Sequence, residues 1–224
     1  MNLPQLKAVE LTERSGLDDW RMLYGCLVGT FRAASFSAAT AFGHQIALAA
    51  DEADHHPDID IRYPNRVRVA LTTHASGGIT ELDVELAGTI SMLAATAGVG
   101  AEPTTAQMME IAIDTLDLGR IRPFWKAVLG YADAPADSDN GQLNALVDLS
   151  RSGPSVWFQT MDAPRPQRSR THLDVFVAAD AAPERLAAAI AAGGRLLTDE
   201  FSPSFWVLAD AEGNEACICT CEDR

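Results

Sequence analysis

The second half of the chain repeats one order of strand and helix patterns, and this repeat restricts the possible folds more than any other feature. Each copy has a strand, a helix and two or three further strands. The elements of the first copy are expected at residues 109–115, 118–129, 143–149 and 155–160. Those of the second copy are expected at residues 171–178, 183–192, 195–199, 205–209 and 215–221. The repeat predicts two βαβββ modules that form one curved sheet.

The first half contains two amphipathic helix patterns and several strand-like runs. Residues 20–24 and 26–32 predict a hairpin. Apolar residues recur three and four positions apart after Ser35 and again after Thr80, which predicts two helices that each bury one face. Residues 66–73 lie between these helices and alternate apolar and polar side chains. That alternation is typical of a half-buried strand.

A segment rich in glycine, proline and threonine separates the two halves. It covers residues 98–105, directly after the second helix pattern, and such a composition is typical of a linker. Residues 1–16 show no clear pattern. We therefore expect an α+β protein with two domains, at residues 1–100 and 106–224. A chain of 224 residues can hold two domains of this size.

Charge and composition exclude several classes of function. The net charge is −14 and the isoelectric point is near 4.6, whereas non-specific nucleic-acid binding requires a basic surface. The chain shows no signal peptide and no long apolar run, so we expect a cytoplasmic protein without membrane contacts. Its four cysteines are Cys26, Cys217, Cys219 and Cys221, and their spacing lacks the C-x-x-C pairs of a zinc ribbon. We expect reduced thiols.

Two adjacent histidines lie at the end of the first helix pattern, in the segment DHHPDID at residues 54–60. Pro57 disfavours helical geometry at the residue before it, so His56 should be extended. His74 ends the next long strand pattern. Histidine titrates near neutral pH, so His55, His56 and His74 suit proton transfer. A polar loop with two solvated histidines is the alternative.

Asp83 also has two possible roles. It follows Thr80 by three residues, which resembles a helix capping box with aspartate in place of glutamate. A purely structural role as a cap is therefore open. A role beside the histidines is the other reading.

Residues 17–97 resemble the pterin-4a-carbinolamine dehydratases, a family also known as dimerisation cofactors. The resemblance rests on His-His-Pro at residues 55–57, Thr-Thr-His at 72–74, Gly-Gly at 77–78 and an aspartate on the following helix. It implies an antiparallel sheet with helices on one face. It also implies that His55, His56, His74 and Asp83 are catalytic. The residues that it places around the substrate are Pro57, Thr73, Ala75 and Ser76.

The resemblance implies a hydro-lyase. The expected reaction dehydrates 4a-hydroxytetrahydropterin (4a-hydroxytetrahydrobiopterin) to quinonoid dihydropterin. Hydroxide is a poor leaving group, so an acid must protonate it while a base removes the N5 proton, and imidazoles can do both near neutral pH. We expect His55 and His74 to face the hydroxyl and N5, with His56 positioning the substrate or sharing this role. No cofactor is needed.

Residues 108–222 resemble a glyoxalase-like domain of the vicinal oxygen chelate superfamily. The matching segments are residues 111–114, 124–131, 157–159, 171–174 and 208–215. Metal-dependent members place a ligand on each of four strands, and the aligned residues here are Glu110, Gln159, His172 and Cys217. His172 alone is a typical ligand at its position, because imidazole and carboxylate usually hold these metals. We therefore expect no metal, with His172 as a weak candidate.

These observations together predict a two-domain enzyme that dehydrates a pterin and forms a homo-oligomer, either a dimer or a tetramer. Neither nucleic acid nor membrane is an expected partner. A second reading is a non-enzymatic dimerisation and partner-binding protein. A third places a glyoxalase or dioxygenase-type activity in the C-terminal domain. The role of that domain is otherwise undetermined.

Overall fold

The computed structural model describes residues 3–12, 14–23, 25–134, 145–164, 172–177 and 179–220. The chain divides into two compact units, Met1–Met108 and Met109–Arg224. Parts of the strands expected at residues 143–149 and 171–178, and the cysteine at position 221, lie outside the described residues. No helix among the described residues is both long and apolar enough to cross a lipid bilayer.

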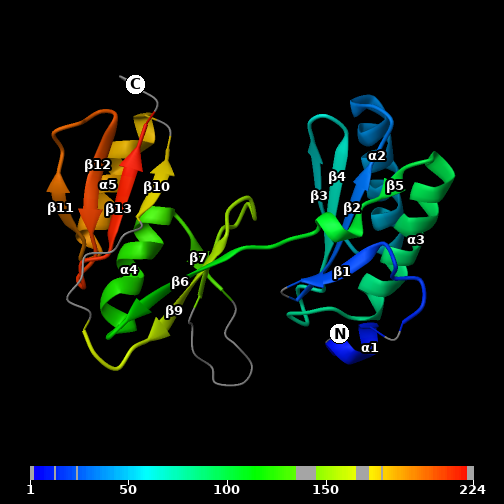
Figure 1. Cartoon of the computed structure of the whole chain (residues 1–224), viewed down its shortest axis with the longest axis horizontal. Helices are drawn as coiled ribbons and strands as arrows, with labels where there is room; N and C mark the ends of the chain where they lie inside the picture. The colour runs from blue at the N-terminus through cyan, green and yellow to red at the C-terminus, as the bar shows by residue number, and fades with distance from the viewer. Residues whose placement is uncertain are drawn as a thin grey trace. The chain divides into compact units, whose positions relative to one another are not determined.

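The N-terminal unit is built on an antiparallel sheet with two long helices on one face (Figure 1). The strands are β1 (Trp20–Leu23), β2 (Cys26–Arg32), β3 (Asp58–Arg62) and β4 (Arg66–Leu71), in the order β1-β2-β4-β3. The helices are α2 (Phe36–Ala53) and α3 (Glu81–Ala97). The prediction of an antiparallel sheet with helices on one face is confirmed.

The core of this unit lies between the sheet and the two helices. Val67, Val69 and Leu71 alternate along β4 and are at most 1% exposed. Phe31 on β2 packs edge-on against Phe42 of α2, with ring centroids 5.4 Å apart. Full burial of one such side chain stabilises the fold by about 1.5–3 kcal/mol. Apolar side chains that recur every two residues on the strands and every 3.6 residues on the helices therefore pack together in one layer.

The segment predicted as a linker contains regular structure. Gly98 ends α3 in the left-handed conformation, with φ 65°. The chain then forms β5 (Gly100–Ala101), which pairs with the end of β2, and the 3-10 turn η1 (Pro103–Thr105). The short helix α1 (Ala8–Thr12) was also not predicted. Neither the pairing of β5 nor a helix of 5 residues leaves a periodic pattern in the sequence.

The C-terminal unit contains two modules with one topology (Figure 1). The first module has β6 (Glu110–Thr115), α4 (Leu118–Leu129), β7 (Ala132–Asp133), β8 (Ala145–Val147) and β9 (Ser155–Thr160). The second module has β10 (Leu173–Phe176), η2 (Ala179–Ala181), α5 (Ala182–Ala191), β11 (Arg195–Thr198), β12 (Phe205–Ala209) and β13 (Glu215–Cys219). The prediction of paired βαβββ modules is confirmed.

The two modules form two sheets rather than the single curved sheet that was predicted. Their strand orders are β6-β9-β8-β7 and β10-β13-β12-β11, and the described residues show no strand pairing between them. In each sheet the first strand runs parallel to the last, since the helix carries the chain across the sheet. Phe124, Trp125 and Val128 of α4 are buried in the apolar core of this unit.

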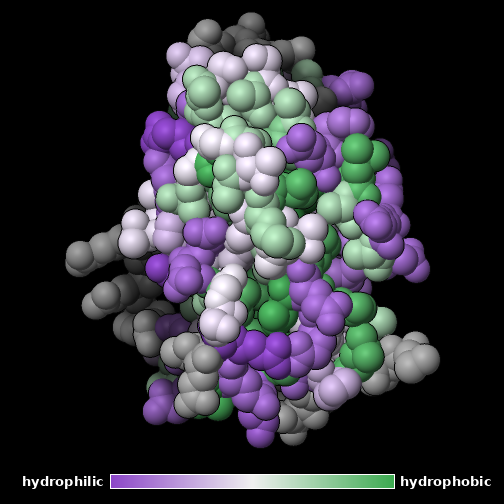
Figure 2. All heavy atoms as spheres, turned by 90° about the vertical axis from the view of Figure 1, so that its right-hand side faces the viewer, coloured by the Kyte–Doolittle hydropathy of each residue, from purple (hydrophilic) through white to green (hydrophobic). Residues whose placement is uncertain are grey.

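The two helices of the N-terminal unit also carry exposed apolar side chains. Phe36 and Leu48 on α2 and Met92 on α3 are between 54% and 66% exposed. Figure 2 views the molecule from the side on which these helices lie in Figure 1, and it shows hydrophobic residues set among hydrophilic ones. Single exposed apolar side chains are normal on protein surfaces, whereas contiguous apolar patches mark binding surfaces.

Candidate active site

The end of α2 places the two adjacent histidines in different environments. Asp54 ends the helix in the left-handed conformation, with φ 48° and ψ 38°. The His55 backbone N–H still donates to the carbonyl of Ala50, at 3.0 Å, and the chain then leaves the helix as Pro57 requires. His55 is 8% exposed, whereas His56 lies on the surface. Two neighbouring residues therefore have one buried and one solvated imidazole.

His55 is held by a fully buried carboxylate. Its Nε2 atom lies 2.8 Å from Oδ1 of Asp83, which is 0% exposed. The other oxygen of Asp83 accepts hydrogen bonds from the Thr80 backbone N–H and the Thr73 hydroxyl, both at 2.7 Å. An ionised carboxylate only accepts hydrogen bonds, so Nε2 of His55 is the donor to such a carboxylate. In a neutral ring with its proton on Nε2, Nδ1 carries a lone pair.

Asp83 therefore combines the two roles that its position suggested. It completes a capping box with Thr80 at the start of α3, and it also binds His55. Thr80 is 0% exposed and was not predicted as part of the site. Its spacing of three residues from Asp83 is the signal that identifies it.

His74 begins a tight turn next to this network. The turn is closed by a bridge between Thr73 and Gly78, with the Thr73 N–H donating to the Gly78 carbonyl at 3.0 Å. His74 and Ala75 are exposed, and Ser76 is half-buried. The Oγ atom of Ser76 is buried without a hydrogen-bond partner among the described residues.

A segment near the N-terminus holds this turn in place. The Gln5 side-chain amide donates to the carbonyl of Ser76. The Leu6 N–H donates to the carbonyl of Ile79 at 2.7 Å. Gln5 was not predicted, because a contact across 71 residues leaves no local signal in the sequence.

Hydrogen bonds thus link His55, Asp83 and Thr73, and His74 follows Thr73 directly. His56 contacts a different carboxylate, since its Nε2 lies 3.0 Å from Oδ1 of Asp51, and both side chains are more than half exposed. Pro57 is half-buried and lies between His56 and β3 in the sequence. The catalytic and substrate-binding roles expected for these residues stay predictions.

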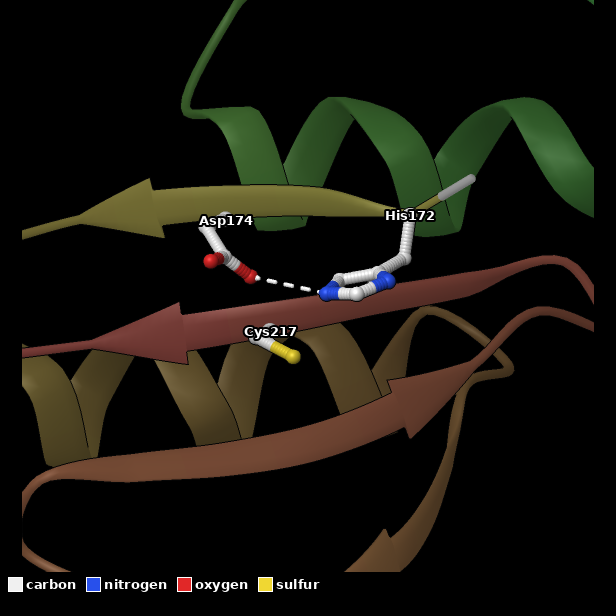
Figure 3. A group of neighbouring side chains, drawn as sticks. All are labelled: His172, Asp174 and Cys217. Atoms are coloured by element: carbon white, nitrogen blue, oxygen red, sulfur yellow. Dashed lines mark ion pairs between the residues drawn. The ribbon is translucent and has the colours of Figure 1, made fainter. Parts of the chain in front are cut away.

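A second cluster of polar side chains lies in the C-terminal unit (Figure 3). His172 lies directly before β10, Asp174 lies on β10, and Cys217 lies on the neighbouring strand β13. Figure 3 shows the three side chains pointing toward one another. Nε2 of His172 lies 3.3 Å from Oδ1 of Asp174, and one ligand atom from each residue lies within 4.8 Å of the others. Asp174 is directly opposite Cys217 in the parallel pairing of the strands.

The thiol of Cys217 lies in a buried and negatively charged environment. Burial raises its pKa to about 12, with further contributions from a hydrogen bond to Asp174 and from the charges of Asp174, Cys219 and Glu215. Cys217 is 6% exposed, whereas the side chains of His172 and Asp174 are about half exposed. In the absence of a cation the thiol is therefore protonated at neutral pH.

The four positions aligned with metal ligands do not form this cluster as a set. His172 and Cys217 belong to it, but Glu110 is not a member and instead accepts a hydrogen bond from the Ser155 hydroxyl at 3.1 Å. Asp174 takes part although it was not predicted. The alternation along the chain places residues 172 and 174 on one face of the sheet, but only the pairing with β13 brings Cys217 beside them.

Comparisons with known proteins find a separate match for each of the two units. Residues 4–93 match the model of the family described as pterin 4 alpha carbinolamine dehydratase, and residues 110–219 match a glyoxalase-like domain. A relative from Chloroflexus aurantiacus, provisionally named a pterin-4-alpha-carbinolamine dehydratase, is 51% identical over 89 residues. The match covers 39% of this chain and 95% of that relative.

Two solved structures are similar to one half of the chain each. A transcriptional coactivator/pterin dehydratase from Brucella melitensis is 35% identical over 41% of this chain and 99% of its own, with a TM-score of 0.38. A glyoxalase/bleomycin resistance protein/dioxygenase family enzyme from Burkholderia phytofirmans is 20% identical over 51% of this chain and 98% of its own, with a TM-score of 0.42.

Proposed function

Because the chain belongs, through its N-terminal unit, to the pterin-4-alpha-carbinolamine dehydratase family, we propose that this unit dehydrates a 4a-hydroxytetrahydropterin such as 4a-hydroxytetrahydrobiopterin. The buried pair of His55 and Asp83 is the observation that carries the proposal. A carboxylate that is 0% exposed and bonded to an imidazole fixes both the orientation and the tautomer of the ring. That arrangement is suited to proton transfer.

The proposed reaction removes one molecule of water and leaves the oxidation state of the pterin unchanged. The C4a–O bond breaks, and its electron pair leaves with the hydroxyl. The N5–H bond also breaks, and its electron pair forms the C4a=N5 double bond of quinonoid dihydropterin. One proton joins the leaving hydroxyl and one leaves N5, so the reaction needs an acid and a base but no redox partner.

We assign these two roles from the hydrogen bonds. His55 has its Nε2 proton held by Asp83, so its Nδ1 lone pair is the base that takes the N5 proton. His74 is exposed on the adjacent turn, and Thr73 ties the start of that turn to the same carboxylate. We assign His74 as the acid that protonates the hydroxyl.

The remaining residues bind the substrate in this proposal. His56 is solvated beside Asp51, where it can contact a pterin as it enters. The half-buried Ser76 and the exposed Ala75 lie in the turn that follows Thr73, and the half-buried Pro57 lies in the loop between α2 and β3. Pterins carry several ring nitrogens and a carbonyl, so the backbone N–H and carbonyl groups of such a turn can supply matching hydrogen bonds.

The test is a dehydration assay on the full chain with freshly generated 4a-hydroxytetrahydropterin. His55→Ala and His74→Ala should each lower kcat by about 10²–10⁴, the usual contribution of general acid–base catalysis. His44→Ala is the matched control, because His44 is an exposed histidine on α2 outside the network. Its kcat should equal that of the wild type. Near wild-type rates in both site variants would exclude the assignment.

The non-enzymatic reading makes the opposite prediction for the unmodified chain. If the N-terminal unit serves only as a dimerisation and partner-binding module, the wild type should not exceed the spontaneous rate of dehydration. We also propose a homo-oligomer, in which Phe36, Leu48 and Met92 on the two helices are apolar side chains that an interface would bury. Light scattering at several protein concentrations measures its order. A monomer at all concentrations would contradict this part.

A further inference from the structure

We infer that Gln5 is a positioning residue for the reaction proposed above, and the inference rests on that proposed function. Gln5 lies near the N-terminus, before α1, and its side-chain amide donates a hydrogen bond to the backbone carbonyl of Ser76. Ser76 is in the same turn as His74, the residue assigned as the acid. A neutral amide does not titrate, so Gln5 acts by holding the turn rather than by transferring a proton.

The carbonyl of Ser76 is held from outside the turn. Within the turn, the N–H groups of Ser76 and Gly77 both donate to the carbonyl of Thr73, at 3.0 and 2.9 Å. Gly77 has a φ of 70°, in the left-handed region, and Gly78 follows it. Glycine loses more conformational freedom on folding than any other residue, so two in succession are costly to order. The hydrogen bond from Gln5 offsets part of that cost.

Gly78 also allows Gln5 to approach the turn closely. A Cβ atom added at Gly78 would lie 3.0 Å from both Cδ and Oε1 of Gln5. Carbon atoms in ordinary contact are about 3.5–4.0 Å apart, so a side chain at this position would press against the amide. Gln5 therefore restrains the turn by direct packing as well as by its hydrogen bond.

The residues that follow Gln5 keep it beside the turn. The N–H of Leu6 donates to the carbonyl of Ile79 at 2.7 Å, and the side chain of Leu6 packs against the apolar core of the unit. Leu11 is 5% exposed in the same core. The guanidinium of Arg14 donates two hydrogen bonds to the carboxylate of Glu81, the first residue of α3. These anchors fix the segment against the turn and the start of the helix.

His74 thus lies between two points at which the turn is held. Before it, the Thr73 hydroxyl donates to Asp83 at 2.7 Å, and after it, the Ser76 carbonyl accepts from Gln5. A general acid must come within hydrogen-bond reach of the group that it protonates. A misplacement of about 1 Å can lower a rate by about 10²-fold. Loss of one neutral hydrogen bond would displace the turn for part of the time, so we expect a loss of about tenfold.

The test is Gln5→Glu in the full chain. This change keeps the shape of the side chain and removes the donor, because an ionised carboxylate only accepts hydrogen bonds. In the dehydration assay kcat should fall by about tenfold and KM should rise by about threefold. KM should change because Ala75 and Ser76, which are proposed to contact the pterin, lie on the same turn. Partial unfolding would lower kcat alone, since the molecules that stay folded keep their KM.

A measurement without pterin tests the hold on the turn directly. Amide hydrogen exchange of Ser76 and Gly77, followed by NMR, should become at least about threefold faster in Gln5→Glu. Gln5→Met removes the donor without adding charge, and it should change kcat, KM and exchange in the same directions. Gln45→Glu is the matched control, because Gln45 is an exposed glutamine on α2. It should keep all wild-type values.

The outcomes separate this inference from the proposed function. If the wild type is active and both Gln5 variants keep kcat within about twofold, the inference is overturned and the proposed function stands. A lower kcat at an unchanged KM, or without faster exchange, also overturns it. A wild type no faster than the spontaneous reaction refutes the proposed function and the role of Gln5 in catalysis together.

Discussion

Replacing Asp83 by asparagine tests the central hydrogen-bond network with a change of one atom. The carboxamide has nearly the shape of the carboxylate but only one accepting oxygen. Thr80 and Thr73 donate to one oxygen of Asp83, so the new oxygen should keep facing them and maintain the helix cap. The amide NH₂ then faces His55, so Nε2 of His55 must accept a hydrogen bond rather than donate one. The ring must therefore change tautomer.

The cost in stability follows from the bonds that lose their charge. Two buried hydrogen bonds, from the Thr80 N–H and the Thr73 hydroxyl, become neutral. A hydrogen bond to a charged group contributes about 1.5–3 kcal/mol and a neutral one about 0.5–1.5 kcal/mol. The free energy of unfolding should therefore fall by about 2 kcal/mol. Most of a typical 5–15 kcal/mol remains, so Asp83→Asn should fold.

The cost in activity should be much larger. With Nε2 accepting from the amide, the proton of neutral His55 lies on Nδ1, which can no longer take the N5 proton. A wrong tautomer in a buried histidine–aspartate pair of a serine protease lowers kcat by about 10⁴. We expect Asp83→Asn to lower kcat for 4a-hydroxytetrahydropterin by about 10²–10⁴, with a smaller change in KM.

Glu85→Gln is the control for this experiment. Glu85 lies on α3 and is exposed, so the variant makes the same change of charge outside the network. Its unfolding free energy should change by less than about 0.5 kcal/mol, and kcat should stay at the wild-type value. Urea unfolding and the dehydration assay give both quantities. A folded Asp83→Asn variant with kcat within about threefold of the wild type would refute a catalytic role for the pair.

Three further predictions concern stability. Phe31→Ala empties a site that is 1% exposed and should lower the unfolding free energy by about 3–5 kcal/mol in urea; a loss below about 1 kcal/mol would contradict the observed packing. Burial raises the pKa of Glu212, but hydrogen bonds from backbone N–H groups and a hydroxyl outweigh this effect and lower the pKa below 4.5. The ionised carboxylate therefore stabilises the fold above pH 4.5, and this stabilisation is lost as pH falls through the folded pKa. Calorimetry should show Glu212→Gln melting below wild type at pH 7, with the difference shrinking in acid; a constant difference would argue against the linkage. Gly194→Ala places a Cβ 2.8 Å from the carbonyl of Ala189 and against the ring of Phe124, so its melting temperature should fall by the equivalent of about 1–3 kcal/mol, and an unchanged value would contradict that contact.

Local chemistry explains which parts of the fold were predictable. Ser35 accepts from the N–H of Ala38 and begins α2, and Gly130 ends α4 with φ 70°. Such caps act within four residues, so the sequence around them is sufficient to locate a helix end. Strand β5 and the separation of the C-terminal strands into two sheets depend on pairing between distant segments. No local pattern encodes that pairing.

The same distinction applies to the candidate sites. The capping box that holds Asp83 spans three residues and was predicted, although its bond to His55 spans 28. The contact between Gln5 and the turn of Ser76 was missed, because it is set by tertiary packing. Asp174 was missed for another reason. Its importance depends on the parallel register that places it opposite Cys217, and register is not visible in either strand alone.

His55 and His56 are adjacent in the sequence but lie in different environments, which supports different roles for the two side chains in the proposed mechanism. Neighbouring residues in extended backbone point their side chains in opposite directions, so a single buried carboxylate can orient only one of them. Asp83 orients His55, and Asp51 contacts His56 on the surface. A ring with a fixed tautomer suits a repeated proton transfer, whereas a solvated ring can adjust to a ligand as it arrives. In the proposed mechanism, the His-His pair therefore supplies one catalytic base and one adaptable contact, and His74 supplies the second proton.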